Sequence, residues 1–325
     1  MGRPIRKTVI LAKLETAYGT DPTPAGATDA LLVSNQTINP LVANNVDRGT
    51  LTGNLGSSEQ LVGTNYVECS FDVDLAGSGT PTTAPAWGKL LKACGFAETT
   101  QTASVDYTPI SDISGVTNTS LTIYYYLDGE LYKLLGTRGS FSIEAGVGER
   151  PVLRFRFIGR NGGITAAANA TPTLTAWRTP QVVTDGNTGD LTMGALTYTA
   201  ATGVVSGGAS FVSRGVRVDV ANNVVFQPLL GGETVEIAQR DPTGTVSLDL
   251  TAAQAVTAMA DVLANTTTGM ALTHGTTAGN IVVLHAPKVQ RINPGMEDLN
   301  GNALHTYALR LLPNTGNDEL RIVSR

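Results

Sequence analysis

A short sequence that occurs twice is the strongest constraint on what this chain can fold into. Val-Ala-Asn-Asn-Val stands at residues 42–46 and again at residues 220–224, an offset of 178 positions. Cys-Ser-Phe-Asp at residues 69–72 and Val-Ser-Leu-Asp at residues 246–249 follow at an offset of 177. A repeat in one order over so long a distance indicates two copies of one folding unit.

Two further pairs of segments extend this repeat. Residues 138–146 align with residues 288–295, and the strand pattern of residues 152–159 aligns with residues 305–312. Four elements therefore recur in the same order, as a tandem duplication of one α+β unit predicts.

The length of 325 residues suits two domains of ordinary size better than one core. We predict two domains, residues 1–163 and 164–325, joined where the chain becomes rich in Gly, Ala, Asn and Thr. A Gly- and Thr-rich segment, residues 184–209, has no counterpart in the first half and is expected at the surface. Within it, residues 191–199 predict a small extra hairpin.

Strand signals dominate the chain, and several alternate with the period of two that a half-buried antiparallel sheet requires. Between residues 66 and 75 one face carries Val67, Cys69, Phe71, Val73 and Leu75, and the other carries Glu68, Ser70, Asp72 and Asp74. Residues 152–159 place Leu153, Phe155 and Phe157 opposite Arg154 and Arg156. Asp128-Gly129 and Asn300-Gly301 mark hairpin turns. The prediction is a mainly β (α+β) protein built from antiparallel sheets.

Two segments are typical of helices, and each follows a strand with an acidic face. Residues 85–94 place Trp87, Leu90, Leu91 and Cys94 on one face, with Gly95 as the stop. Residues 251–264 open with a capping box from Thr251 to Gln254 and carry Val256, Met259 and Leu263 on one face. Each predicted domain thus has one flanking helix.

Charge is scarce in this chain. Charged residues make up 15%, against roughly 25% in ordinary soluble domains. A surface of neutral hydroxyls and amides suits a protein covered by copies of itself, because such groups are desolvated at lower cost than charges. The net charge of −5, with no long basic run, argues against tight binding of nucleic acid.

The inventory of reactive residues argues against an enzyme and against a cofactor or metal site. His274, His285 and His305 are spaced 11 and 20 residues apart, which matches no helix-borne metal pair. Serine-nucleophile, phosphate-loop and dinucleotide motifs do not occur. Residues 185–190 resemble a calcium loop, but they lack the closing Glu, so we predict a solvated turn.

The two cysteines and the apolar segments indicate a protein made and folded in a reducing cytoplasm. Cys69 and Cys94 have no framework spacing, and we expect both to be reduced core residues. The N-terminal apolar run, residues 8–14, is broken by Lys13 and lacks the pattern of a signal peptide. Apolar runs long enough for a membrane helix are absent from the sequence, so no membrane is expected among the partners.

Several segments, in order over nearly the whole chain, resemble the tail tube proteins of long-tailed, non-contractile bacteriophages. They are residues 15–22, 59–77, 84–96, 133–139, 274–280 and 311–320. Segment 184–209 departs from the compact pattern of such proteins. The resemblance implies a non-enzymatic subunit, without cofactors, of two tandem tail-tube-like domains, each an antiparallel β-sandwich or half-barrel with one flanking helix. The inner sheets of such subunits would join side by side into a closed β-barrel ring around a channel for DNA. Ring closure would remove exposed strand edges.

The same resemblance implies partners and symmetry. Rings are sixfold for single-domain subunits, so three copies of a two-domain chain would form a pseudo-sixfold ring. The partners would be other copies of the chain, the tail tape measure protein, and the tail tip and terminator proteins. Viral DNA would pass through the lumen without sequence-specific binding. The protein would be located in the virion tail after assembly in the host bacterial cytoplasm.

Candidate functional residues follow from this resemblance. The inner sheet of the first domain would consist of residues 66–75, 139–145 and 152–159 and the strand before Arg48. Side chains expected to face the lumen are Glu68, Asp72, Asp74, Glu144, Arg154, Arg156, Asp219, Asp249 and Arg310, whose acidic excess would repel the DNA backbone. The expected loop for stacking one ring on the next contains Arg48, Leu51, Leu55, Glu59 and Gln60, with residues 228–236 as its weaker counterpart.

Three other functions are compatible with a β-rich chain. A tail terminator or capsid decoration protein is also β-rich and symmetric, but it has no need of two tandem tube-like domains. A carbohydrate-binding or adhesive β-sandwich normally exposes aromatic side chains, whereas aromatics total 6% here and Trp87 is on an apolar helix face. A hydrolase on a β scaffold is disfavoured by the inventory of reactive residues.

Overall fold

Strands dominate the computed structural model, which describes residues 2–113 and 119–325. In the first half the elements are η1 (Ile5–Lys7), β1 (Thr8–Leu14), α1 (Gly26–Asp29), β2 (Ala30–Leu31), β3 (Ser34–Asp47), β4 (Gln60–Asp74), α2 (Gly88–Ala93), β5 (Phe96–Thr100), β6 (Val105–Pro109), β7 (Leu121–Leu127), β8 (Glu130–Gly146) and β9 (Val152–Ala166). In the second half they are β10 (Leu191–Thr199), β11 (Val204–Asp219), β12 (Asn222–Leu229), β13 (Gly232–Arg240), β14 (Thr243–Asp249), α3 (Ala252–Leu263), β15 (Thr267–His274), β16 (Val282–Leu299), β17 (Asn302–Leu311) and β18 (Arg321–Ser324). The predicted mainly β, antiparallel class is confirmed.

Eight of these strands form one continuous sheet, which we call the inner sheet. Antiparallel pairs connect them in the order β3-β4-β9-β8-β11-β14-β17-β16. The four strands expected in the first half are its first four members. β8 and β11 join the two halves edge to edge, from the pair Gly146 and Gly215 to the pair Ser142 and Asp219.

Strand pairing in the two halves follows the same plan. β3, β4 and β9 pair in sequence, and β11, β14 and β17 pair in the same way. A register shift separates Ser34 from Thr37 in β3, and another separates Ser213 from Val216 in β11. Two rows of paired residues face the core: Ile38, Cys69 and Phe157 in the first half, and Val216, Val246 and Tyr307 in the second.

An outer layer of strands covers the apolar face of the inner sheet. β2, β1 and β7 continue onto the first part of β8, and β10 and β15 continue onto the first part of β16. β10 pairs with β15 as β1 pairs with β7, so residues 191–199 are a member of the main sheet rather than a separate small hairpin. β18 lies between β16 and β6 and thereby ties the two halves a second time.

The core lies between these layers, and the alternation in the sequence explains it. Val67, Cys69, Phe71, Val73 and Leu75 are all buried, as are Leu153, Phe155 and Phe157. Phe155 and Phe157 stack with ring centroids 5.5 Å apart. Both predicted hairpin turns are present, with positive φ at Asp128, Gly129, Asn300 and Gly301.

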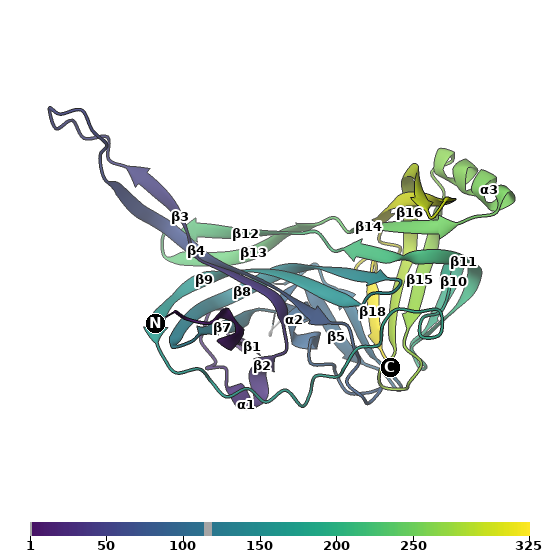
Figure 1. Cartoon of the computed structure of the whole chain (residues 1–325), viewed down its shortest axis with the longest axis horizontal. Helices are drawn as coiled ribbons and strands as arrows, with labels where there is room; N and C mark the ends of the chain where they lie inside the picture. The colour runs from purple at the N-terminus through teal and green to yellow at the C-terminus, as the bar shows by residue number, and fades with distance from the viewer. Residues whose placement is uncertain (1, 114–118) are drawn as a thin grey trace.

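The two predicted helices are present, but their surroundings differ. α2 is shorter than expected, and Trp87, Leu90 and Leu91 are buried as its apolar face requires. α3 has the predicted capping box at Thr251. Its expected apolar face is exposed, however, because α3 packs against β16 through the opposite side, where Asp261 accepts a hydrogen bond from Arg291 at 2.5 Å. Figure 1 shows α3 at one end of the long axis and the tip of the β3–β4 hairpin at the other.

The segment between the halves packs along the first half. The predicted boundary after residue 163 falls inside β9, which ends at Ala166. Beyond it, Thr173 donates its backbone N–H to Gly26 O at 2.9 Å, and Trp177 Nε1 donates to Ala30 O at 3.0 Å. Residues 167–190 therefore form a strap across α1 and β2 instead of a free linker.

Candidate functional site: the charged face of the inner sheet and its projecting hairpins

The face of the inner sheet that points away from the core carries charged side chains in register across neighbouring strands. Arg156 on β9 pairs with Glu68 on β4 at 3.1 Å. Glu144 on β8 lies between Arg154 at 2.6 Å and Arg217 of β11 at 3.3 Å. We call this surface the charged face.

Two acids expected on this face are held by neighbours. Asp72 accepts a hydrogen bond from Asn35 Nδ2 at 2.8 Å and is only 8% exposed, so it contributes little to the open surface of the single chain. Asp74 pairs with Arg150 at 2.7 Å. Both interactions connect β4 to the ends of neighbouring segments.

The residues expected on the charged face in the second half are more open. Asp219 Oδ1 accepts the backbone N–H of Ala221 at 2.8 Å, where β11 ends. Asp249 is exposed at the end of β14, and Arg310 on β17 pairs with Asp241 at 3.0 Å. All nine predicted residues lie on strands of the inner sheet.

Several charged residues of this surface were missed by sequence reasoning. Arg150, Arg214 and Arg217 pair with Asp74, Glu297 and Glu144, and Asp241 pairs with Arg310. The sequence held a signal for Arg217, because it is two residues from Asp219 and the two side chains therefore share one face of β11. Six acids and three arginines were predicted, and the additions make eight acids and six arginines, so the acidic excess is smaller than expected.

Glu144 is the residue of this surface whose loss we expect to matter most for the fold. Glu144→Gln should lower the free energy of unfolding by about 1 kcal/mol, because two arginines then lose their shared, largely buried counter-charge. Arg156→Ala is the control and should cost less than about 0.5 kcal/mol, because its side chain is 68% exposed. Urea unfolding measures both, and equal effects would contradict the shared role of Glu144.

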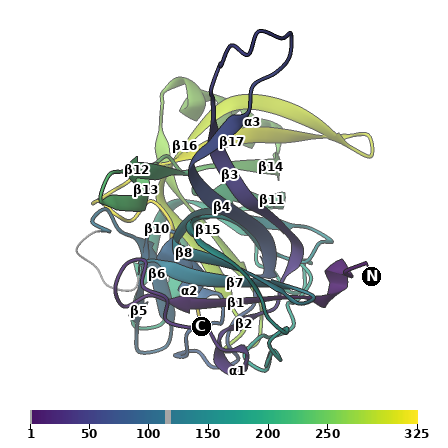
Figure 2. The same cartoon turned by 90° about the vertical axis from the view of Figure 1, so that its left-hand side faces the viewer.

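The distal part of the β3–β4 hairpin, residues 44–63, projects from the body, and we call it the arm (Figure 2). An ion pair of Arg48 with Glu59 closes its loop, and Ser58 donates to Asp47 at 2.6 Å. Leu51 and Leu55 have 100% and 107% relative exposure. Gln60 is the first residue of β4 and pairs with Asp47. The loop thus presents two apolar side chains on a hydrogen-bonded base.

The β12–β13 hairpin occupies the corresponding place between β11 and β14, but it folds back over the first half. Arg138 Nη1 donates to Val235 O at 3.0 Å, and the backbone N–H of Val235 donates to Tyr18 Oη at 2.6 Å. Phe226 lies 5.4 Å from Tyr66 between ring centroids. Residues 228–236 form its tip, where Leu230 is fully exposed.

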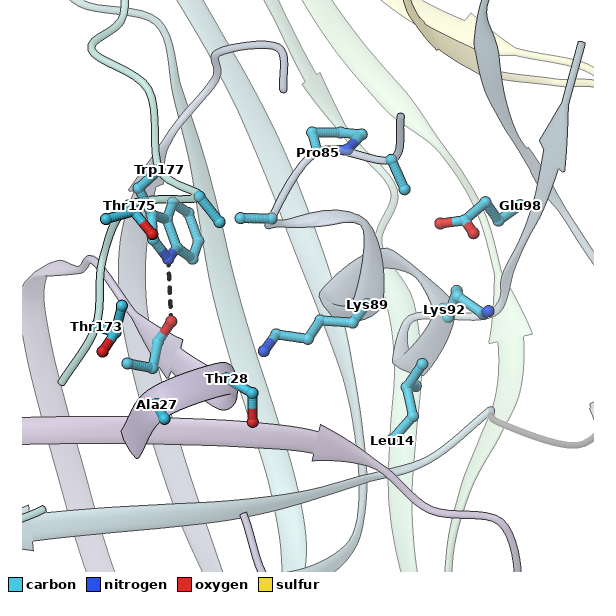
Figure 3. A pocket seen from close by; sticks show the side chains of 14 residues that line it. Leu14, Ala27, Thr28, Pro85, Lys89, Lys92, Glu98, Thr173, Thr175 and Trp177 are labelled. Atoms are coloured by element: carbon cyan, nitrogen blue, oxygen red, sulfur yellow. Dashed lines mark hydrogen bonds between the residues drawn. The ribbon is translucent and has the colours of Figure 1, made fainter. Parts of the chain in front are cut away.

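A cavity lies where the strap crosses α2 (Figure 3). Lys89 and Trp177 line it, and Lys89 Nζ donates to Asp29 O at 3.3 Å. Burial lowers the pKa of Lys89 to about 8. The indole of Trp177 donates to Ala30 O, so both side chains hold the strap and α2 to the segment at α1 and β2. This arrangement accounts for the cavity as a structural joint.

His274 and His285 lie on the paired strands β15 and β16, and His305 lies on β17. His274 Nδ1 is 2.8 Å from Thr188 Oγ1, whereas both ring nitrogens of His285 have no hydrogen-bond partner within the described residues. Burial and Arg321 lower the pKa of His285 to about 4. Residues 2–113 and 119–325 contain no group of three or more His, Cys, Asp or Glu side chains that could hold a metal ion. Residues 185–190 form a turn in which the backbone N–H groups of Asn187 and Thr188 donate to Thr184 O.

Both cysteines are free and buried, as expected of core residues. Desolvation raises the pKa of the Cys69 thiol to about 12 and that of Cys94 well above its usual value. Among the described helices, not one has the length and apolar character needed to cross a membrane.

Comparison with known proteins supports the expected family. The model of a family described as phage tail tube protein matches residues 5–304. A search of the curated proteins found no match. The family match covers nearly the whole chain, including both hairpins and all of the inner sheet except most of β17. This chain therefore belongs to the phage tail tube protein family.

Proposed function

We propose that three copies of this chain close into a pseudo-sixfold ring, and that stacked rings form a tail tube whose lumen conducts DNA during genome ejection. Membership of a structural tail family indicates a virion component without enzymatic activity. One observation carries the finer proposal: the inner sheet already joins two similar four-stranded units edge to edge within one chain. The two terminal strands of the inner sheet are β3 and β16. They correspond to β11 and β8, the two strands that pair at this internal seam.

The proposal requires that the two halves are copies of one unit, and the strand registers support this. The row Ile38, Cys69 and Phe157 corresponds to the row Val216, Val246 and Tyr307 at offsets of 178, 177 and 150 residues. Ser140 and Gly295, which pair with Arg156 and Thr306, extend the correspondence to β8 and β16 at an offset of 155. The first two offsets equal those of the repeated sequences. In this proposal the boundary between the two domains lies after Ala166, the last residue of β9.

The internal seam predicts how neighbouring chains pair. In the seam, Ser142 of β8 is opposite Asp219 of β11. Ser142 corresponds to Glu297 of β16 at the offset of 155, and Asp219 corresponds to Leu41 of β3 at the offset of 178. We therefore expect Glu297 of one chain to lie opposite Leu41 of the next. Among the described strands, β3 pairs with β4 alone, and residues 291–299 of β16 pair with β17 alone. Pairing between chains would satisfy both edges, which otherwise invite aggregation.

The charged face would line the lumen of such a ring. Its alternating ion pairs leave a modest acidic excess, and the exposed Asp249 and half-buried Asp219 have no adjacent basic run. A surface of this kind offers phosphates no array of cations, so DNA would slide past it without lasting contacts. The exposed Leu51 and Leu55 of the arm suit contact with the next ring. Tape measure, tip and terminator proteins would contact the tube lumen and its ends.

Electron microscopy of concentrated purified protein tests this proposal. We expect hollow filaments, with end-on class averages that show three subunits and six similar lobes per ring. Isolated globules under all concentrations and salt conditions would overturn the tube. Rings of six whole chains would overturn the trimer while leaving the tube intact.

A further inference from the structure

We propose that the arm of each subunit docks on the neighbouring subunit of the same ring, with Asn44 hydrogen-bonded to the end of α3 and to β16. This inference rests on the proposed ring and names the partner surface of the arm. The partner is a second copy of this chain, and the docking site consists of the C-terminal turn of α3 and residues 291–299 of β16.

The β12–β13 hairpin provides the template for this contact inside one chain. Asn222 opens the hairpin, and its Nδ2 donates to Cys94 O at 2.8 Å and to Gly139 O at 3.0 Å. Its backbone N–H donates to Ser140 Oγ at 3.0 Å. Cys94 is the C-cap residue of α2. One amide side chain therefore fastens a hairpin of the second unit to the helix end and the inner strand of the first unit.

Asn44 is the counterpart of Asn222 in the repeated sequence Val-Ala-Asn-Asn-Val. It is exposed in the single chain, whereas Asn222 is partly buried. The residue corresponding to Cys94 is Ala264, the C-cap residue of α3, and the residue corresponding to Gly139 is Pro294 at the offset of 155. Both carbonyls belong to exposed residues. The pentapeptide would thus make one contact within the chain and the same contact between chains.

The position of the hairpins supports docking within a ring. β11 pairs with β8 of the unit that its own hairpin covers. By the same geometry, β3 would pair with β16 of the unit that the arm covers. β3 also changes register between Asn39 and Val42 and between Ala43 and Asn45, close to the level at which positive φ at Ala221 turns the chain from β11 into β12. These register shifts are places where β3 can bend, at the level at which the arm must turn toward the neighbouring subunit to dock.

Apolar side chains on the two surfaces match. On the arm, Val46, Leu61 and Val62 are 51%, 53% and 62% exposed. On the proposed docking site, Leu263 and Met296 are 78% and 75% exposed, with Val256 at 72% on the same helix. Exposed apolar groups of this extent mark an interaction surface. The arm and α3 lie at opposite ends of the molecule (Figure 1), so the contact runs head to tail and closes in a ring.

Cysteine cross-linking in assembled tubes tests the contact and its location. The variant Asn44→Cys/Pro294→Cys, oxidised after assembly, should yield covalent species that end at the trimer on a denaturing gel. Cys69 and Cys94 are 1% and 0% exposed and should remain silent, and the two single variants are the controls. A ladder extending beyond the trimer would place the contact between Asn44 and Pro294 between rings and overturn the inference, as would tubes that do not cross-link.

Substitution of the repeated asparagine provides an independent readout. Asn44→Ala should raise the concentration needed for assembly at least about tenfold, the effect of roughly 1.4 kcal/mol per contact, without changing the melting temperature of the unassembled chain. Asn45→Ala, beside it in the arm, should assemble normally. Asn222→Ala should lower the melting temperature instead. Unchanged assembly of Asn44→Ala would overturn the inference alone, whereas an unmodified chain that never forms tubes would overturn the proposed function with it.

Discussion

We expect the double variant Leu51→Asp/Leu55→Asp to form no tubes at concentrations where the unmodified chain assembles, and to melt at the same temperature. Both leucines are fully exposed at the tip of the arm, so they contribute nothing measurable to the stability of the single chain. In a stacked assembly they would be desolvated, and an aspartate in their place would bring an unpaired charge into the contact. Sedimentation of tubes and thermal unfolding by circular dichroism measure the two effects.

The control carries the same charge change in the same loop. Thr50→Asp/Thr52→Asp alters two exposed polar neighbours of the leucines and should still assemble, with a stronger dependence on salt. Normal tubes from the leucine variant would remove the arm tip from the contact between rings. Loss of assembly in both variants would show that charge, and not the two apolar side chains, decides the result.

Acid should destabilise this protein through His285, which is 5% exposed, stacks on Tyr198 and has a pKa lowered to about 4 by burial and by Arg321. The unfolded chain has a pKa near 6.5 and binds the proton first, so stability falls as pH drops from 6.5 to 4. The shift corresponds to up to about 3 kcal/mol over this range. Above pH 6.5 the imidazole is neutral in both states, and the effect is absent.

Replacing His285 removes this part of the pH dependence. His285→Phe keeps an aromatic ring that can stack on Tyr198. His285→Leu is a second variant, which replaces the imidazole by an apolar side chain that has no ring. Both should lose less stability than the unmodified chain between pH 6.5 and 4, in denaturant titrations at each pH. Parallel curves for all three proteins would contradict a proton uptake by His285 on unfolding.

Sequence reasoning found the elements whose side chains alternate strictly. Val67 to Leu75 fixed the buried face of β4, and Asp128-Gly129 and Asn300-Gly301 fixed two turns, because burial and positive φ each leave a local signature. The charged residues proposed for the lumen lie on the inner sheet for the same reason. Arg150 and Arg214 were missed because they lie near strand ends or bulges, where alternation fails.

Long-range register was beyond the sequence. The alignment of residues 152–159 with 305–312 implies an offset of 153, whereas strand pairing favours 150. The difference of three residues is odd. The sequence alignment therefore matches Phe157 to Arg310, whose side chain lies on the opposite face of β17 from the buried Tyr307. The sequence did not reveal that β10 corresponds to β1. The two strands occupy equivalent positions in the sheet, but their sequences are not similar. The exposure of α3 depends on tertiary packing, which helical periodicity does not encode.

β18 has a consequence for how the chain folds. This strand, residues 321–324, completes the sheet of β5 and β6, and Arg321 reaches Asp106 across a separation of 215 residues. Contacts between such distant positions raise the contact order. The chain between them must lose its loop-closure entropy before the hydrogen bonds of β18 can form and offset that cost. Folding should therefore be slow, and the first half should not reach its final state ahead of the second. The same interlocking opposes piecewise opening, so the finished subunit should persist far longer than its thermodynamic stability alone implies.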